Sequence, residues 1–215
     1  MTGEMQEVIE HSVELTEYSK LAFMTIANTA RNCYQSGELV NLEKAREFVK
    51  MLIHKGHESP LEFASVTFRI VTSRDVTHEL VRHRLASYAQ ESTRYVRYSG
   101  GVQLVRPVDI PELNPDGTLN DAFLAWLRGC REAGKAYLEI LKLTGRPELA
   151  RTVLPGSTKT TIIMKMNMRE FRHFIKLRTS PAAHPDMRCV AGLCRKRVEE
   201  VELGDFLEGV SITPA

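Results

Sequence analysis

The residues best suited to chemistry lie in one run near the middle of the chain. Arg82, His83 and Arg84 are consecutive, and a group of polar side chains follows within ten residues: Ser87, Gln90, Ser92, Thr93 and Arg94. Hydroxyl, amide and guanidinium groups donate hydrogen bonds to phosphate oxygens, and a guanidinium can donate two in parallel. We therefore expect this run to bind the phosphate of a nucleotide.

The spacing of Arg82, His83 and Arg84 restricts how they can act together. In a helix, three successive residues fan out over roughly 200°, so they cannot all face one small ligand. Either the backbone leaves helical geometry there, or these residues address different ligands or subunits around a shared site, which would favour an oligomer. The alternative is a solvated face, in which five basic residues between positions 82 and 97 pair with Glu79 and Glu91.

Arg178 is a second candidate, from a different part of the chain. Counted from Phe171, Phe174 and Ile175, position 178 continues an apolar helical stripe. The other polar residues of the segment fall on the opposite side: Arg169, Arg172, His173 and Lys176. An unpaired buried guanidinium is costly, so a carboxylate or an anionic ligand should meet Arg178. A structural salt bridge or a snorkelling side chain at a helix end is the alternative.

The first half of the chain predicts the elements that position the basic run. Apolar spacing predicts a helix from about Ala45, capped by Asn41 and stopped by Gly56. Ser59-Pro60-Leu61-Glu62 has the form of a capping box, so a helical turn should begin there. Alternation over 66–71 predicts a half-buried strand. A helix should then run from about Thr72, with Asp75 completing its N-terminal cap, and carry the basic run at its far end before breaking near Ala86.

The second half predicts further helices and strands. Segments 95–98 and 102–106 are β-like, and Asn114-Pro115-Asp116-Gly117 is a turn. A long helix is expected over 119–144, a strand over 161–166, a helix capped by Asn167 with Glu170 three residues on, and a last helix from Pro185. The pattern favours an α+β fold in a single domain, 1–215, with a mostly antiparallel sheet packed by helices.

Composition narrows the class of protein. The net charge is +2 over 215 residues, which argues against DNA or RNA as a partner. The polar, acidic N-terminus does not resemble a signal peptide, and no apolar stretch is long enough to span a membrane, so a soluble cytoplasmic protein is expected. The four cysteines form no CxxC pair and should be reduced, with Cys130 and Cys194 buried on helical stripes.

The sequence does not predict a metal site or a Rossmann domain. His54 and His57 lie near Glu58 and Glu62, but the spacing is not HExxH or a comparable ligand pattern. No GxGxxG or Walker sequence is present either.

The run from Arg82 to Arg94, RHRLASYAQESTR, resembles the RHRxxSxxxxSxR signature of the flavin-dependent thymidylate synthases, with every fixed position filled. The resemblance extends over most of the chain, through His57 with Ser59-Pro60 and Glu62, Ala150-Arg151 with Leu154-Pro155, Asn167-Met168-Arg169, and Arg178. It implies the thymidylate synthase-complementing protein fold and a homotetramer whose sites draw residues from different subunits.

Carried over residue by residue, the resemblance implies three groups. The FAD contacts would be Ser59, Arg82, His83, Arg84, Gln90, Asn167, Arg169 and His173. The nucleotide contacts would be Glu79, Arg82, Glu91, Ser92, Thr93, Arg94, Arg151 and Arg178. His57 would lie near the flavin and folate.

Three positions depart from the family pattern. Glu79 stands where many members have Gln, His173 stands where an amide is common, and Ala183-His184-Pro185-Asp186 replaces a more usual Ala-Gln-x-Glu. An ionised carboxylate at position 79 accepts hydrogen bonds but cannot donate them. We expect the glutamate at position 79 to alter recognition of the base or the ribose.

The chemistry implied by the resemblance is the methylation of dUMP at C5 to give dTMP. NADPH would reduce FAD, methylenetetrahydrofolate would donate the carbon, and hydride would pass from the flavin to the pyrimidine. Without an enzyme nucleophile, charge developing on the ring must be stabilised, and Arg178 is our candidate because a fixed cation in a dry site does this well. Ser92 has no adjacent base, so we expect it to bind phosphate.

Two other functions remain open from the sequence. The same chemistry could act on UMP, as in nucleoside-antibiotic pathways. A non-catalytic RNA- or nucleotide-binding module could instead use the arginines on phosphates and stack bases on Tyr88, Tyr95 and Tyr98.

Overall fold

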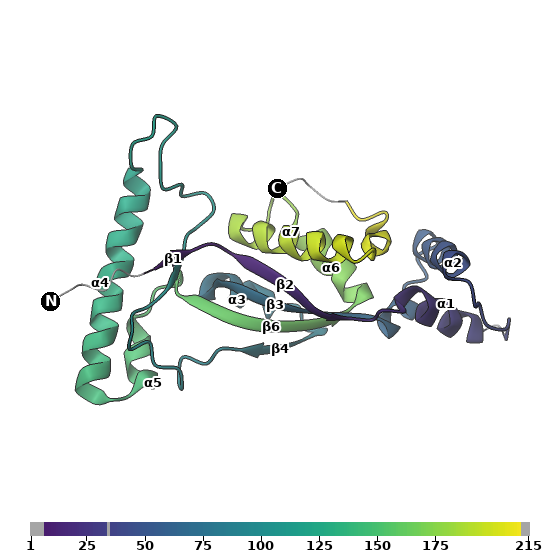
Figure 1. Ribbon diagram of the computed structural model, residues 1–215, viewed down its shortest axis with the longest axis horizontal. Coiled ribbons are helices and arrows are strands. Elements are labelled where there is room, and N and C mark those ends of the chain that lie inside the picture. The colour runs from purple at the N-terminus through teal and green to yellow at the C-terminus, as the bar shows by residue number, and fades with distance from the viewer. Residues whose placement is uncertain (1–6, 34, 212–215) are drawn as a thin grey trace.

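A four-stranded antiparallel sheet forms the centre of the molecule in the computed structural model, which describes residues 7–33 and 35–211 (Figure 1). Its strand order is β2 (Ser12–Tyr18), β3 (Ser65–Ser73), β6 (Lys159–Asn167) and β4 (Ala86–Gln90). All three pairings are antiparallel. A separate parallel pair joins β1 (Val8–Ile9) to β5 (Leu104–Val105). The predicted α+β fold with a mostly antiparallel sheet is confirmed.

One face of the sheet supplies the main hydrophobic core. Val66, Phe68 and Ile70 on β3 lie opposite Met166, Met164 and Ile162 on β6, and all six side chains are buried. Successive residues of a strand point to opposite faces, so this register gathers the apolar set on one side. Helices α6 (Met168–Arg178) and α7 (Pro185–Glu200) cover that side, with α3 beside them (Figure 1).

The other face of the sheet is polar and open within the chain. Arg69 on β3, Lys165 on β6, and Ser87 and Ala89 on β4 are exposed, while Ile163 is half-buried. Among the described residues, no helix covers this polar face as fully as α6 and α7 cover the apolar face.

The two ends of the sheet carry separate helical groups (Figure 1). At one end lie α1 (Ala22–Asn32) and α2 (Leu42–His54), followed by the short η1 (Ser59–Phe63). At the other end α4 (Asp121–Thr144) stands with α5 (Pro147–Ala150) and η2 (Arg151–Val153) over a second hydrophobic cluster that includes Leu104 and Tyr137. The turn η3 (Gly204–Leu207) follows α7 and closes over the main core.

Most predicted helix ends are confirmed. Asn41 caps α2 by accepting from the Lys44 N–H, and Asn167 caps α6 by accepting from the Glu170 N–H. Gly145 ends α4 with φ 66°, the left-handed conformation that glycine adopts without steric cost. The helical turn at Ser59 is present, but Glu58 occupies the cap position without a side-chain bond, so the predicted capping box is wrong.

The helix before the basic run is shorter than predicted. Helix α3 spans Arg74–Leu80 and is capped by Ser73, whose Oγ accepts from the Val76 N–H, not by Asp75. It ends six residues before Ala86 because the chain must reverse to pair β4 with β6. Tyr88 stabilises this ending, since its hydroxyl donates to the carbonyls of Leu80 at 2.6 Å and of His83 at 3.1 Å.

Other segments also differ from the sequence-based expectation. The β-like segment 95–98 is not a strand, whereas β4 was not predicted and β5 occupies part of the expected 102–106 piece. Strand β2 and helix α1 were not predicted either. The turn at 114–117 is confirmed by a bridge between Leu113 and Leu119.

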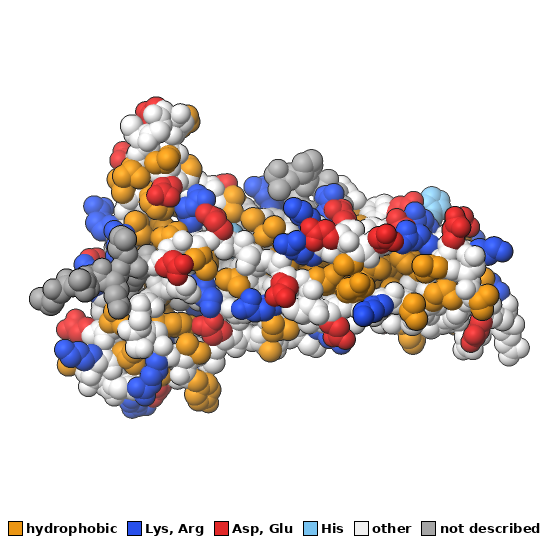
Figure 2. Space-filling view, viewed as in Figure 1, with side chains coloured by type: hydrophobic (Ala, Val, Ile, Leu, Met, Phe, Trp, Pro, Cys, Tyr) orange, Lys and Arg blue, Asp and Glu red, His pale blue; other side chains and the backbone are white. Residues whose placement is uncertain are grey.

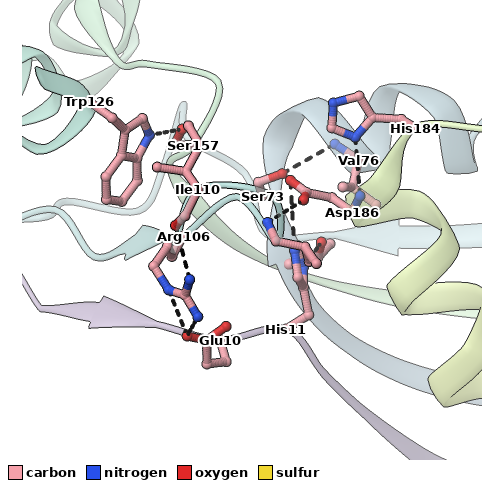
Figure 3. A network of polar contacts seen from close by, with 12 residues as sticks. Glu10, His11, Ser73, Val76, Arg106, Ile110, Trp126, Ser157, His184 and Asp186 are labelled. Atoms are coloured by element: carbon pink, nitrogen blue, oxygen red, sulfur yellow. Dashed lines mark hydrogen bonds and ion pairs between the residues drawn. The ribbon is translucent and has the colours of Figure 1, made fainter. Parts of the chain in front are cut away.

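A buried polar network ties the N-terminal strands to the rest of the molecule (Figure 3). His11 Nδ1 lies 2.9 Å from Thr72 Oγ1, and its Nε2 lies 3.8 Å from Asp186 at the start of α7. Asp186 also accepts from the Val108 N–H at 2.7 Å. Arg106 donates to Glu10 in the same region. These contacts hold together the chain before β2, the chain after β5 and the start of α7.

The surface matches the small net charge. Lys and Arg side chains alternate with Asp and Glu over the face shown in Figure 2, with no large region of one sign. Among the residues described, none of the helices is long and apolar enough to cross a bilayer. Cys130 and Cys194 are buried and all four cysteines are free thiols, as expected.

Candidate functional site

Arg178 lies at the centre of a tightly bonded group at the end of α6. Its Nε donates to His83 Nε2 at 3.0 Å, its Nη1 to Glu79 Oε2 at 2.6 Å, and its Nη2 to the Glu79 carbonyl at 3.0 Å. The side chain is 14% exposed. A carboxylate therefore meets Arg178, as both the buried-partner prediction and the salt-bridge alternative require, and the guanidinium is fixed by three bonds. Two of its five N–H groups remain, one on each terminal nitrogen.

His83 connects Arg178 to a buried acid. Its Nδ1 lies 2.9 Å from Glu170 Oε1, and the imidazole is 4% exposed. Burial lowers the pKa of His83, and the Arg178 cation lowers it further, while the Glu170 carboxylate opposes the shift. The Arg178 Nε that faces His83 Nε2 can only donate, so Nε2 carries no proton and the ring is neutral in this arrangement. The Glu170 contact is accordingly a hydrogen bond from Nδ1–H to a carboxylate, not an ion pair.

A cavity of about 620 Å³ opens beside this group. Asn167, Arg169 and His173 line it, and so does Leu85, which follows the basic run directly. Its other lining residues are Glu58, Glu62, Glu170, Arg172, Lys176, Gly209 and Val210. The side-chain oxygen of Asn167 accepts the hydrogen bond that caps α6, so its amide N–H₂ is the group that can still bind a ligand. Three predicted FAD contacts from the segment 167–173 thus line one cavity together with Leu85.

A second polar group lies at the other end of β4. Gln90 donates to Thr77 and Thr160, and Glu91 pairs with Lys159 at 3.0 Å. Tyr98 donates to the same Glu91 at 2.7 Å. Burial raises the pKa of the Tyr98 phenol, and the bond to Glu91 raises it further, so the phenol stays protonated.

Residues predicted to hold phosphate lie at this same end. Arg151 Nη1 donates to Thr93 Oγ1 at 3.3 Å, and Thr93 is buried. Arg94 and Arg151 are exposed, and Ser92 accepts from the Arg94 N–H. Guanidinium and hydroxyl groups gathered on one surface form a suitable anion site.

The two groups are separated along β4. Ala86 pairs with Met166 near the cavity, whereas Gln90 pairs with Ile162 near the second group. Four residue steps of a strand span about 13 Å. One chain therefore does not bring all the predicted nucleotide contacts to one point, because Glu79 and Arg178 lie at one end and Arg94 and Arg151 at the other.

The remaining predicted residues lie around these groups. Arg82 and Arg84 leave helical geometry in the turn after α3 and are exposed, while the His83 side chain between them points inward. This supports the first of the two geometric options for the basic run. Ser59 and His57 are exposed at η1 and just before it.

The solvated-face alternative is wrong in its pairings. Glu79 pairs with Arg178 and Glu91 with Lys159, so neither glutamate neutralises the arginines at 82, 84 or 94. The positions of the three tyrosines also disfavour base stacking. The hydroxyls of Tyr88 and Tyr98 bond within the protein, and only Tyr95 of the three tyrosines is exposed, at 76%.

Some residues of the site were not predicted from sequence. Glu170 was seen only as part of a cap, Lys159 was not singled out, and Tyr98 was named only as a possible base-stacking residue. Arg172 was placed on the polar side of its helix but is buried, because the chain after α7 folds over it. It donates to the carbonyls of Phe206 and Glu208 and to Glu58 at 3.0 Å.

His83, Glu170 and His173 could also surround a cation, since their ligand atoms lie within 4.8 Å of one another. Both ring nitrogens of His83 already have partners, however, and Arg178 stands next to one of them. Repulsion from the guanidinium disfavours a cation here. The geometry favours a hydrogen-bonded chain.

Comparisons with known proteins show which family this chain resembles. A family model described as thymidylate synthase complementing protein matches residues 14–202. A flavin-dependent thymidylate synthase of Pyrococcus abyssi is 35% identical over 198 residues, covering 88% of this chain and 78% of the relative. One from Corynebacterium efficiens is 34% identical, covering 94% and 92%.

Solved structures show the same fold. A UMP/dUMP methylase, PolB, from Streptomyces cacaoi with bound 5-Br dUMP superimposes with a TM-score of 0.76 at 25% identity, covering 97% of this chain and all of the other. Thymidylate synthase X of Helicobacter pylori with FAD and dUMP gives a TM-score of 0.74 at 25% identity, covering 92% and 99%.

The antiparallel sheet packed by helices on one face, with a charged cavity beside α6, places the chain in the α+β class. More particularly, the chain belongs to the flavin-dependent thymidylate synthase family, because the family model and the relatives both cover most of its length. The resemblance stated from the signature is thereby confirmed.

Proposed function

We propose that this enzyme methylates C5 of dUMP reductively to give dTMP, with FAD as cofactor, methylenetetrahydrofolate as carbon donor and NADPH as reductant. The observation that carries the proposal is the fixed Arg178 guanidinium, which His83 links to Glu170 in the lining of the 620 Å³ cavity. The relatives named as flavin-dependent thymidylate synthases and the Helicobacter pylori structure with FAD and dUMP support it.

The cavity suits a flavin dinucleotide by the chemistry of its donors. Lys176 supplies positive charge at its rim, Arg169 lies there paired with Glu62 at 2.7 Å, and Asn167 offers a free amide N–H₂. Such groups complement a pyrophosphate and the polar edge of a flavin ring. When bound, the flavin would supply the hydride that passes to the pyrimidine.

We assign the FAD contacts to both side chains and backbone. The proposed set is Ser59, Arg82, His83, Arg84, Gln90, Asn167, Arg169 and His173, with His57 near the flavin and folate. His83 uses both ring nitrogens within the protein, so its contact would come from its backbone or ring edge. His173, which is exposed at the cavity wall, can present its imidazole directly.

Arg178 is the residue proposed to act on the reacting ring. Its guanidinium is charged at any working pH, and its two unused N–H groups can reach a ring carbonyl and N3. A cation held in place before the reaction stabilises negative charge on the pyrimidine without reorganisation. Glu79 and His83 hold the guanidinium in that orientation.

The nucleotide phosphate would be held by the second polar group. The proposed nucleotide contacts are Glu79, Arg82, Glu91, Ser92, Thr93, Arg94, Arg151 and Arg178. Arg94 and Arg151 provide two exposed guanidinium groups, and Ser92 and Thr93 provide hydroxyls. Phosphate binding, not nucleophilic attack, is the role proposed for Ser92, which has no base beside it among its described contacts.

We further propose a homotetramer in which neighbouring subunits complete each site. The resemblance to the family implies sites that draw residues from different subunits, and in one chain the two polar groups stand at opposite ends of β4. The open sheet face carries half-buried Ile163 among polar residues, which suits a surface that meets another subunit. Sedimentation of the flavin-loaded protein tests this assembly.

UMP is the second candidate substrate. The PolB structure, which is described as a UMP/dUMP methylase, superimposes over 97% of this chain. A carboxylate at Glu79 could accept a hydrogen bond from a ribose 2′-hydroxyl, whereas a 2′-deoxyribose offers none.

The test is a direct comparison of the two nucleotides. The purified protein, checked for a flavin absorbance spectrum, is incubated with FAD, NADPH and methylenetetrahydrofolate and either dUMP or UMP. Chromatography with mass detection should show a product 14 mass units heavier than the substrate, about one CH₂. A flavin-loaded protein that methylates neither nucleotide contradicts the proposal.

A further inference from the structure

Glu170 is a buried acid that neither the signature nor the proposed chemistry uses. It is 6% exposed, lies in the first turn of α6, and was expected only to follow the Asn167 cap. A buried carboxylate needs a partner, because removing a charge from water is costly. The helix N-terminus stabilises its charge in part. Its side-chain bond goes to His83 Nδ1, at 2.9 Å, not back to the cap.

The two nitrogens of His83 have opposite roles. Nε2 must accept a hydrogen bond, because the Arg178 Nε that faces it at 3.0 Å can only donate. Nδ1 must donate, because the Glu170 carboxylate that faces it can only accept. A neutral imidazole carries one proton, so these two demands are met by a single tautomer. The other tautomer would place N–H against N–H at Arg178 and a lone pair against the carboxylate.

We propose that Glu170 is a positioning residue that holds His83 in the Nδ1–H tautomer, so that Nε2 accepts from Arg178 and orients its guanidinium toward the substrate. The first part of this inference concerns the apoprotein alone, while the orientation toward a pyrimidine rests on the proposed function. The continuous chain runs from Glu170 through His83 and Arg178 to Glu79, over bonds of 2.9, 3.0 and 2.6 Å.

The surroundings of His83 reinforce this arrangement. Phe174 packs edge-on against the ring with centroids 5.2 Å apart, and the His173 ring lies 5.7 Å away. An apolar wall excludes water that could otherwise satisfy either nitrogen. The choice of tautomer therefore depends on Glu170 and Arg178.

Two substitutions separate positioning from simple filling of space. Glu170→Leu removes the acceptor but keeps similar bulk, whereas Glu170→Gln keeps a carbonyl acceptor for Nδ1–H and removes only the charge. Positioning through a hydrogen bond predicts that Gln rescues what Leu loses. A role in packing alone predicts that the two variants behave alike.

The first measurement is the tautomer itself. Ring ¹⁵N NMR of histidine-labelled protein, with and without flavin, reports which nitrogen of each imidazole is protonated, and the signal lost in His83→Gln assigns the residue. We expect Nδ1–H in the wild-type protein and in Glu170→Gln, and a lower Nδ1–H population in Glu170→Leu, in which Arg178 alone still favours it. An Nε2–H tautomer in the wild type, or an unchanged Nδ1–H in Glu170→Leu, overturns the inference.

The second measurement is turnover by the flavin-loaded enzyme. Loss of a charge-assisted bond that orients Arg178 should lower kcat of Glu170→Leu by about 10- to 100-fold, with a smaller change in KM for the nucleotide. Glu170→Gln should recover a large part of that loss. Equal losses in the two variants, or unchanged kcat in Glu170→Leu, contradict the positioning role.

A double-variant cycle tests the route of the effect. In His83→Gln the amide oxygen can accept from Arg178 without any help from position 170, so adding Glu170→Leu should cost little more. Full additivity of the two losses would show that Glu170 does not act through His83. If the wild-type enzyme methylates neither nucleotide, the proposed function fails, but the NMR result still decides the tautomer.

Discussion

Arg178→Lys separates catalysis from folding most sharply. A lysine ammonium can keep the ion pair with Glu79, but one nitrogen cannot also reach His83 Nε2 in the geometry of the guanidinium. The Glu79 carbonyl keeps a partner, since it also accepts from the Arg82 N–H at 3.2 Å. The structural loss is therefore one unsatisfied acceptor at His83, whose side chain is 2% exposed.

The magnitudes of the two effects differ. One buried unsatisfied acceptor costs about 1–3 kcal/mol of unfolding free energy. For a chain of this length, that lowers Tm by about 2–12 °C. Removing a preorganised donor from developing charge costs about 10²- to 10³-fold in kcat. Turnover should therefore collapse in a variant that remains folded at room temperature.

The assay compares nucleotide methylation with thermal unfolding followed by circular dichroism, both on flavin-loaded protein. Arg195→Lys is the matched control, because Arg195 forms an exposed pair with Glu199 on α7 and should change stability by at most about 0.5 kcal/mol. Wild-type turnover in Arg178→Lys would remove Arg178 from its catalytic role. A loss of turnover explained fully by unfolding would refute the reasoning as well.

Three other perturbations have defined outcomes. Because burial lowers the pKa of His83 below its usual 6.5, the unfolded chain binds the extra proton first, and stability should fall as pH drops below about 6.5, by up to ~1.4 kcal/mol per unit. Urea unfolding midpoints of the wild type and of His83→Gln between pH 5 and 8 check this, and an equal dependence of the two midpoints on pH would contradict it. The charged or titratable groups that set the pKa shift of His83 are Glu170, Arg178 and His173. Arg151→Ala should raise KM for the nucleotide about tenfold or more with little change in kcat, because it removes a phosphate contact and no group near the ring; a change confined to kcat would argue against that placement. Phe68→Ala should cost about 3–5 kcal/mol in denaturant unfolding, since the ring is fully buried between the sheet and α6, and a loss below ~1 kcal/mol would place the core elsewhere.

Local signals in the sequence were enough to predict the helices whose ends are set by the type of their capping residue. Asn41, Asn167 and Gly145 mark helix ends through bonds or φ values that depend on their own residue type. Strands β3 and β6 have a clear two-residue alternation because one face is buried and the other open. Such features need no knowledge of distant contacts.

The missed elements depend on partners far away in sequence. Strand β4 is only five residues long, Ala-Ser-Tyr-Ala-Gln, and contains no β-branched residue, so it exists because β6 pairs with it. Helix α3 stops at Leu80 because the chain must turn toward that pairing. Arg172 is buried only because the segment after α7 folds over a helix face that is polar by periodicity.

The candidate site shows the same division. The signature supplied the guanidinium groups and hydroxyls, and the stripe on α6 supplied Arg178 and its need for an acid. Glu170 could not be assigned, because its bond to His83 joins residues 87 positions apart. A glutamate three residues after a helix cap is usually explained by the cap itself, and only the tertiary contact shows otherwise.

The most direct test of the central claim follows the hydrogen on C5 of the pyrimidine. Methylation at C5 must replace that hydrogen, so flavin-loaded enzyme given dUMP tritiated at C5, NADPH and methylenetetrahydrofolate should release tritium to water in step with dTMP formation. If the tritium stays on the nucleotide although flavin is bound, the result contradicts the account, whether or not NADPH is oxidised.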